Sequence, residues 1–397
     1  MVVGTFRINK MLQIMIPIST VFMYHVNVWS GETIWTLFNI VQYGMMVVIL
    51  LKNPRLPMTP FFRWVVGIIL VSVIVSAFNP YRNESFGAIL NMAKCIIPVY
   101  FYTTYSEENG NTKIILWSLF LAGAIVAIEL MMNFDVASTI SAQYLSTTRL
   151  GLGGIEHPNT TGYNLFIAFC AGIVLLSFGR EDNDRMCGII CSIGIVLSVV
   201  GCLLTGSRKV LIGIVLVLLL MLLIRSNNPI KLLFGMIAIC VIAVIAYRIM
   251  MSNVVLYNLL GNRLESFFAG TDASSMGRND LIYDAFKVGI NSVIGVGFGN
   301  YRFYNNGGFY AHNEILEIFS GIGLVGMLVY YIPIILSVYK MYVKKIYKKN
   351  LHNAALFSVM ISVIVLDYYQ VTYSLYSYFY IMAILFMINN SSLYAGE

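Results

Sequence analysis

Residues 253–313 read NVVLYNLLGNRLESFFAGTDASSMGRNDLIYDAFKVGINSVIGVGFGNYRFYNNGGFYAHN. This stretch is polar, whereas the sequence on either side of it is a succession of apolar runs. A loop of this length is uncommon unless it carries a function or is a flexible linker. We therefore expect the working surface of the protein to lie here. The alternative is a passive connection between two helices.

The composition outside this stretch is that of a membrane protein. Hydrophobic residues make up 59% of the 397 residues and charged residues only 11%, which a soluble globular domain does not show. We predict an all-α polytopic membrane protein, a single transmembrane domain over 1–397, with one large extracytoplasmic loop (251–313) that contains short surface helices. Apolar runs long enough to cross a bilayer predict about twelve spans, at 11–29, 34–51, 61–79, 86–104, 113–132, 161–178, 186–204, 208–224, 229–250, 314–338, 352–370 and 371–388.

The positions of lysine and arginine predict the orientation. Cytoplasmic loops carry an excess of these residues, and the loops that share a side with the N-terminus hold most of them. The densest cluster comprises five lysines between 340 and 349. We predict that both termini are cytoplasmic and that the long loop lies outside. A basic cluster beside a membrane span is typical of a cytoplasmic loop that faces anionic lipid. The net charge of +7 therefore does not indicate a nucleic-acid partner.

Two further features lie on the predicted outer side. Residues 147–164 read TTRLGLGGIEHPNTTGYN and contain Arg149, His157 and Asn159. The hairpin 205–209 reads TGSRK, and its basic residues run against the expected charge bias. Either they snorkel to the interface, or Arg208 faces an anion at the outer leaflet.

The long stretch contains a predicted surface helix over about 277–288. Ser274 or Ser275 can cap its start and Gly289 can end it. Arg278 then lies in the first turn, where the helix dipole disfavours a cation. An anionic ligand would satisfy this arginine; pairing with Asp280 is the alternative.

The glycines at 295, 297 and 299 predict a turn. They do not indicate a nucleotide loop, because no strand–turn–helix unit surrounds them. A turn that brings backbone close to a ligand or to a helix is the better interpretation.

We predict no metal site and no other cofactor. Asp182 and Asp184 form a DxD sequence of the kind that holds a metal in sugar-nucleotide enzymes, but they lie in a short inner loop. A solvated turn is the better interpretation. The six cysteines lie in or beside apolar runs and predict no disulfide framework.

His312 and Asn313 begin a pattern that continues with Leu316, Phe319, Gly323 and Gly326. It resembles the HN-x-x-L signature, followed by G-x-x-G, of the O-antigen ligase and Wzy-type polysaccharide polymerase superfamily. Three further pieces resemble the family in the same order: Pro158-Asn159, Gly206-Ser207-Arg208, and Arg278 followed by the turn 295–299. The resemblance covers about the second two-thirds of the chain. One position departs from it, because many members carry glutamate where this chain has Gly321.

The resemblance implies transfer of a glycan from an undecaprenyl-diphosphate carrier to an acceptor hydroxyl on the outer face of the membrane. No metal or nucleotide sugar takes part. A polymerase extends another lipid-linked repeat unit of a capsule, exopolysaccharide or O-antigen, whereas a ligase transfers the glycan to a final acceptor. The implied partners are the lipid-linked oligosaccharide and membrane lipid, with a chain-length regulator and a flippase as further candidates; nucleic acid is not among them.

Physical chemistry assigns roles to the residues within this resemblance. Without a metal, arginines must hold the diphosphate, because guanidinium binds phosphate oxygens bidentately and stays charged. The candidates are Arg208 and Arg278, then Arg149 and Arg302. His312 is the candidate base, although it could instead cap the following helix. The candidates for positioning the acceptor or the loop are His157, Asn159, Asn313, Gly297 and Gly299.

We favour the polymerase, because a composition rich in Ile, Asn, Lys and Tyr is compatible with the many bacteria that lack lipid A. The ligase is the rival within the same class. A flippase is the rival in another class, and it would be expected to show inverted repeats with broken helices near the midplane. A structural scaffold would not depend on Arg278 or His312.

Overall fold

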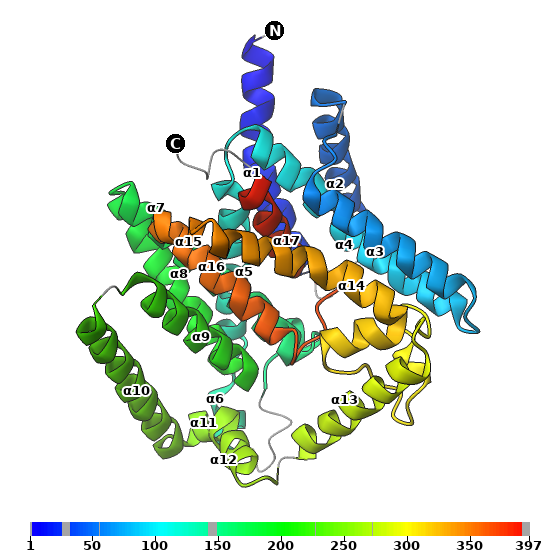
Figure 1. The fold of residues 1–397 in the computed structure, drawn as a ribbon. Coiled ribbons are helices and arrows are strands. Elements are labelled where there is room, and N and C mark those ends of the chain that lie inside the picture. The colour runs from blue at the N-terminus through cyan, green and yellow to red at the C-terminus, as the bar shows by residue number, and fades with distance from the viewer. Residues whose placement is uncertain are drawn as a thin grey trace. The chain divides into compact units, whose positions relative to one another are not determined.

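The computed structural model describes residues 2–25, 32–54, 56–141, 149–226, 228–271 and 273–390. Every regular element in these ranges is helical (Figure 1). In chain order the elements are α1 (Val2–Tyr24), α2 (Glu32–Lys52), α3 (Pro60–Ala77), α4 (Arg82–Glu108), α5 (Lys113–Met132), α6 (Val136–Ser141), η1 (Leu152–Gly154), α7 (Pro158–Glu181), α8 (Arg185–Leu204), α9 (Arg208–Arg225), α10 (Pro229–Ser252), α11 (Val254–Leu256), η2 (Tyr257–Gly261), α12 (Asn262–Phe268), α13 (Ala273–Asn291), η3 (Tyr301–Phe303), α14 (Glu314–Val343), α15 (Ile346–Lys349), α16 (Leu351–Leu366) and α17 (Tyr376–Asn390).

Among the described helices, 8 are long and apolar enough to cross a membrane. They are α2, α3, α4, α5, α7, α8, α10 and α14. The prediction of an all-α protein with many spans is therefore confirmed. The remaining predicted spans coincide with α1, α9, α16 and α17, which fall outside that set. The count of twelve stays a prediction.

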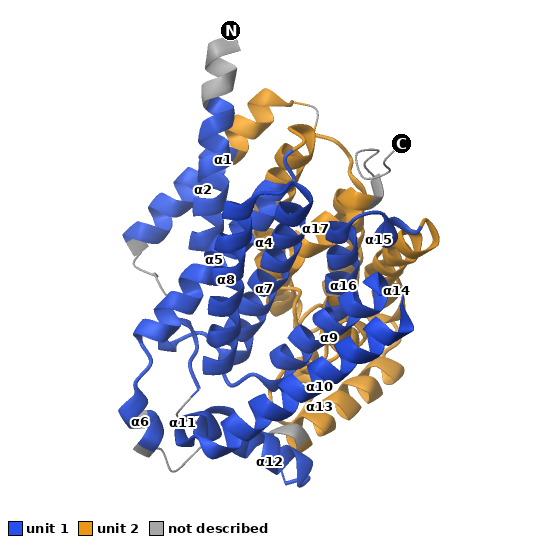
Figure 2. Cartoon of the chain, turned by 90° about the vertical axis from the view of Figure 1, so that its left-hand side faces the viewer, with its two compact units in different colours: residues 1–45, 111–272, 345–362 blue, residues 46–110, 273–344, 363–397 orange. Residues whose placement is uncertain are grey.

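The chain divides into two compact units (Figure 2). Unit 1 consists of residues 1–45, 111–272 and 345–362, and unit 2 of residues 46–110, 273–344 and 363–397. The long polar stretch contributes its first part, up to residue 272, to unit 1 and the remainder to unit 2. The single domain over 1–397 and the loop over 251–313 stay predictions.

Unit 1 is built around α7. This helix is buried over most of its length among α5, α8 and α9, as its largely apolar surface requires. Small residues let its neighbours approach. A Cβ added at Gly194 of α8 would lie 2.1 Å from the ring of Phe120 in α5, and one at Gly172 of α7 would lie 3.0 Å from the same ring. Phe120 thus fits against two glycines, as small residues commonly allow between membrane helices.

Unit 2 is built around a break in α14. Ile322 and Gly323 leave the helical conformation, and Gly323 has φ +71. The turn that follows α13 lies against this break. Its amides at Val296 and Gly297 donate to the carbonyls of Ser320 and Gly321, over 2.9 and 2.8 Å. In return Leu324 N–H donates to the carbonyl of Val293, over 2.9 Å. The turn therefore replaces hydrogen bonds that the broken helix lacks.

The glycine turn approaches a helix, as one of the sequence interpretations proposed. Gly295, Gly297 and Gly299 all have positive φ. A Cβ at Gly295 would lie 2.5 Å from the Gly321 carbonyl oxygen, and one at Gly323 would lie 2.3 Å from the Val293 carbonyl oxygen. Gly323 is therefore needed for the break and the close backbone contact.

The predicted surface helix is longer than expected, and two of its boundary signals were wrong. α13 spans Ala273–Asn291, so Ser274 and Ser275 lie inside it and do not precede it. Gly289 does not end it either. A Cβ there would lie 2.4 Å from the Phe319 ring, so this glycine lets α13 and α14 pack closely. Arg278 is not in the first turn, and the helix-dipole argument for an anion at this residue no longer holds.

Gly295→Ala should destabilise unit 2. The added methyl group would meet backbone atoms that cannot move aside, at a φ of +101, and strain of this kind costs about 1–3 kcal/mol before any steric term. We expect a clear fall in the thermal unfolding midpoint of the detergent-solubilised protein. Gly277→Ala in α13, where nothing lies within 4 Å of an added Cβ, is the matched control. Equal midpoints for the two variants would contradict the interlocking of the turn with α14.

Candidate functional site

The start of α14 in unit 2 holds the His312-Asn313 pair. Asn313 is the N-cap, and its Oδ1 accepts from Leu316 N–H over 3.0 Å. Asparagine is among the preferred N-cap residues, so the capping role that was the alternative for His312 belongs to its neighbour. His312 has φ +57, a conformation that non-glycine residues adopt rarely and mainly at sites that constrain it. Its ring is half-buried and lies 4.1 Å, centroid to centroid, from the ring of Tyr310.

Two buried glutamates follow within the first turns of α14. Glu317 Oε2 accepts from Ala311 N–H over 2.7 Å, which fixes the backbone just before His312. Glu314 accepts from Tyr330 Oη over 2.8 Å and from Thr372 N–H over 2.7 Å. Carboxylates are stabilised near a helix N-terminus. Glu317 therefore holds the segment that carries the histidine.

Two arginines affect the pKa values of tyrosines that Glu317 also affects. Burial raises the pKa of Tyr310; the Arg278 charge opposes this rise and the Glu317 carboxylate adds to it. Burial also raises the pKa of Tyr373, and there Glu317 adds to the rise while Arg302 opposes it. The resulting cluster at the start of α14 combines one histidine, two arginines and a carboxylate.

Packing holds this cluster together. Ala285 of α13, Tyr301 of η3 and Ala311 form one fully buried group, and Tyr301 Oη donates to the Leu281 carbonyl of α13 over 2.8 Å. The helix that bears Arg278 is thus fixed to the segment that bears His312. Asn313 Nδ2 is buried, and among the residues that the structure describes it has no hydrogen-bond partner. It is a donor suited to a ligand oxygen.

Unit 1 holds a second basic cluster, around the hairpin between α8 and α9. Arg208 Nη1 donates to the Arg263 carbonyl over 2.6 Å, and Arg263 Nη1 donates to the Gly206 carbonyl over 2.8 Å. Arg149 donates to the Thr205 carbonyl over 3.0 Å and to Asn159 Oδ1 over 2.7 Å. Three guanidinium groups therefore converge on one hairpin, and a concentration of like charge of this kind favours an anion.

The arginines of this cluster rest on tight backbone contacts. Gly206 has φ +58, and a Cβ there would lie 2.7 Å from the Leu259 carbonyl. Leu259 belongs to η2, a π-helical turn, and such turns occur often at functional sites. Arg208 also lies over the ring of Phe267, 4.9 Å from its centroid. Arg208 and Arg263 are therefore held in defined positions.

The turn before α7 places the remaining candidates of unit 1. His157 is the N-cap of α7, and its Nδ1 accepts from Asn159 N–H over 3.1 Å. His157 therefore has a local structural role at the start of α7. Glu156 accepts from the Thr161 hydroxyl over 2.6 Å, and burial raises the pKa of Glu156 to about 7. An acid that titrates near neutral pH therefore lies in the same turn.

The structure groups the predicted site residues by unit. Arg149, Asn159 and Arg208 lie together in unit 1. In unit 2, Arg278, Arg302 and His312 lie around Tyr310 and Glu317, and Gly297 and Gly299 belong to the turn that fixes α14. No comparison with known proteins tests the role of any of these residues, so their functional assignments stay predictions.

Sequence reasoning missed three residues. Glu314 and Glu317 were not among the predicted site residues, although two glutamates directly after His312-Asn313 at the start of an apolar run were the available signal. Arg263 was not among them either. Its contact with the hairpin 205–209 depends on tertiary structure, and no local pattern indicates it.

The DxD sequence has ordinary structural roles. Asp184 is the N-cap of α8 and accepts from Cys187 N–H over 3.0 Å. Asp182 forms an ion pair with Lys113 over 2.6 Å, between exposed side chains. Each carboxylate is therefore accounted for by local structure, in line with the interpretation as a turn.

Comparison with known families identifies one segment. Residues 193–331 match the family described as O-Antigen ligase, Wzy_C, which confirms the resemblance predicted from the sequence. The match contains Arg208, Arg263, Arg278, His312 and the glycine turn, and it leaves Arg149, His157 and Asn159 outside. No curated protein matches the chain.

Glu156 predicts a pH dependence of stability. Its pKa rises from 4.5 to about 7 on folding, so as the pH increases the unfolded chain releases this proton first. Below pH 4.5 this group does not reduce the free energy of unfolding. Between pH 4.5 and about 7 the free energy of unfolding falls as the pH rises, and above that range it stays lower by at most roughly 3 kcal/mol. We expect Glu156→Gln to have a higher thermal midpoint than the wild type near pH ~8 and the same midpoint near pH ~4.5.

Thr161→Val provides the second arm of this test. The Thr161 hydroxyl favours the charged carboxylate, so its removal should extend the loss of stability to higher pH. Parallel pH profiles for wild type and Glu156→Gln would show that the carboxyl is not buried as described.

Proposed function

On the premise that residues 193–331 form an O-antigen ligase domain, we propose that the protein polymerises undecaprenyl-diphosphate-linked repeat units into a surface polysaccharide. The family acts on lipid-linked oligosaccharide, and the chain has the helices of a multi-pass membrane protein. The reaction is a glycosyl transfer in which the lipid diphosphate leaves. The proposed location is the outer face of the bacterial cytoplasmic membrane.

The observation that carries the proposal is the cluster at the start of α14. Arg278 and Glu317 both act on Tyr310, whose ring lies beside His312. A histidine base, an arginine cation and polar side chains thus lie together at the start of the apolar helix α14. A lipid-linked sugar presents its diphosphate and its anomeric carbon to a protein at such a boundary, because its tail stays in hydrocarbon.

The residues of this cluster divide the reaction between them. His312 accepts the proton of the acceptor hydroxyl, whose oxygen forms the new bond to the anomeric carbon. The bond from that carbon to the diphosphate oxygen breaks, and the undecaprenyl diphosphate leaves with the additional negative charge. Arg278 and Arg302 stabilise this charge. Attack from the face opposite the leaving group inverts the anomeric configuration.

Positioning residues complete the assignment. Glu317 fixes the backbone at Ala311 and with it the place of His312. The buried amide of Asn313 is a donor suited to an acceptor oxygen. In unit 1, Arg208, Arg149 and Arg263 form a second basic cluster, which we assign separately as a candidate site for an anion.

The amino-acid composition supports one class of acceptor. A composition rich in Ile, Asn, Lys and Tyr is compatible with bacteria that lack lipid A, and this supports a second lipid-linked repeat unit as the acceptor. Transfer to a final acceptor, as by a ligase, uses the same cluster and the same leaving group. The two reactions differ in the products that accumulate when the cluster is damaged.

His312→Ala and Arg278→Ala should abolish long surface polysaccharide at matched membrane levels. Loss of a general base typically costs ~10²–10⁴-fold in rate, and loss of one charge-stabilising group about 10²–10³-fold. The measurement is the size distribution of surface glycan in cells. We expect the ladder to collapse to a single repeat unit on its carrier or its final acceptor.

Arg225→Ala, which removes an exposed arginine from the last turn of α9, is the control for charge loss and should keep the ladder. If His312→Ala and Arg278→Ala instead leave long polymer on the lipid carrier, the protein is a ligase. Repeat units retained on the inner leaflet would identify a flippase. An unchanged ladder in both cluster variants would exclude this site.

A single displacement also predicts that no glycosyl-enzyme forms. Mass spectrometry of the protein quenched during turnover should find only unmodified chain, and the anomeric configuration of the new linkage should be opposite to that of the donor. A covalent sugar adduct on any side chain would refute inversion by one step.

A further inference from the structure

A groove of about 750 Å³ runs along α14 in unit 2, on the part of the helix farthest in sequence from His312. Its lining residues come from α3, α14 and α17. The apolar ones that matter below are Trp64, Leu328, Ile332, Leu336 and Phe386. Two cationic residues, Arg63 and Lys340, also line it. Nothing in the proposed glycosyl transfer uses this groove.

The groove is formed where α3 meets the C-terminal half of α14. Pro333 lies inside α14 and has no N–H to donate. Near it, Trp64 Nε1 donates to the Tyr330 carbonyl over 2.8 Å, and a Cβ on Gly67 would lie 3.2 Å from Val329. The Trp64 ring in turn lies 5.5 Å from the ring of Phe386. These contacts hold the two helices together at one end of a fixed hollow.

Arg63 and Lys340 come from the ends of two helices that line this groove. Arg63 is in the first turn of α3 and Lys340 in the last turn of α14, and both side chains are exposed. From Leu328 to Lys340 the helix rises by about 18 Å, which is the scale of a lipid acyl chain. The walls along this length include Leu328, Ile332 and Leu336, exposed by 43, 44 and 57%.

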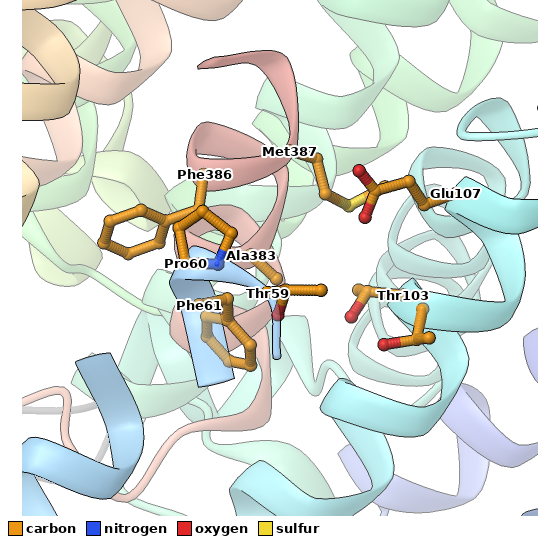
Figure 3. A pocket seen from close by; sticks show the side chains of 9 residues that line it. Thr59, Pro60, Phe61, Thr103, Glu107, Ala383, Phe386 and Met387 are labelled. Carbon is orange, nitrogen blue, oxygen red and sulfur yellow. The ribbon is translucent and has the colours of Figure 1, made fainter. Parts of the chain in front are cut away.

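The hollow next to the groove is too small to be the binding site. Figure 3 shows Pro60 and Phe386 together on one side of it, with Thr103 and Glu107 across from them. Its volume is about 10 Å³, which is room for about one water molecule. A ligand with a chain of any length must lie in the larger groove.

We propose that the groove binds one acyl chain of an anionic glycerophospholipid, with the lipid phosphate between Arg63 and Lys340. Guanidinium binds phosphate oxygens bidentately and ammonium adds a point charge. The apolar walls require a chain, which excludes free phosphate as the occupant. A zwitterionic lipid fills the walls equally well but offers no net charge to the two cations. The sequence predicts that both cations lie on the cytoplasmic side, where anionic lipids are abundant.

The test compares lipid binding to the purified full-length protein by native mass spectrometry. Phosphatidylglycerol and phosphatidylcholine with identical acyl chains are titrated separately. We expect the wild type to prefer phosphatidylglycerol, and the double variant Arg63→Ala/Lys340→Ala to lose about fivefold per cation, or roughly 25-fold in total. Lys344→Ala, which removes a neighbouring lysine that does not line the groove, should keep the preference.

Two further arms separate the lipid from its headgroup. Leu336→Trp fills the groove without changing its charge and should reduce the binding of both lipids. Soluble glycerophosphoglycerol should not compete with the lipid, because it lacks the chain. Equal binding of both lipids to the wild type, or an unchanged preference in a monodisperse double variant, would overturn the proposal. Effective competition by the soluble headgroup would overturn it too.

Discussion

The hydrogen bonds between the glycine turn and the broken helix α14 are the constraint on which unit 2 depends. A membrane offers no water to a helix that breaks, so each free backbone group needs a protein partner. The turn after α13 supplies these partners through Val293, Val296 and Gly297. The exchange works only because the backbones approach to within the space of a missing Cβ at Gly295 and Gly323. Helix α13, the turn and α14 are thereby held as one piece.

This arrangement explains why a strained histidine can persist at the start of α14. The positive φ of His312 costs free energy that the surroundings must supply. Asn313 caps the helix on one side of it, and Glu317 holds Ala311 on the other. Both contacts come from a helix end whose position is already fixed. The candidate site thus uses rigidity that originates in the packing of membrane helices.

The two basic clusters solve the same electrostatic problem in different ways. In unit 1 the guanidinium groups of Arg149, Arg208 and Arg263 are held by backbone carbonyls, which carry no net charge and leave the positive potential in place. In unit 2 the positive charge of Arg302 and the negative charge of Glu317 have opposite effects on the pKa of Tyr373. Glu317 therefore offsets part of the positive potential of Arg302.

The sequence predicted the class of fold and the start of the helix that follows Asn313, because both leave local signals. Long apolar runs specify membrane helices, and the change from a polar stretch to an apolar run at His312-Asn313 marks the start of a helix. The sequence also predicted that glycines 295–299 bring backbone close to a helix. It failed at the boundaries of α13, where serines that could cap a helix lie inside it.

Tertiary structure decided the rest, because the remaining features depend on which segments meet. Arg263 joins the hairpin through contacts with Gly206 and Arg208, and each of these residues is more than fifty positions away from Arg263 in the chain. Gly289 continues a helix instead of ending it, since Phe319 of a different helix packs against it. Gly323 breaks α14 because a turn from elsewhere supplies hydrogen bonds. Composition and periodicity fix what each segment is, whereas only packing fixes the groups it faces.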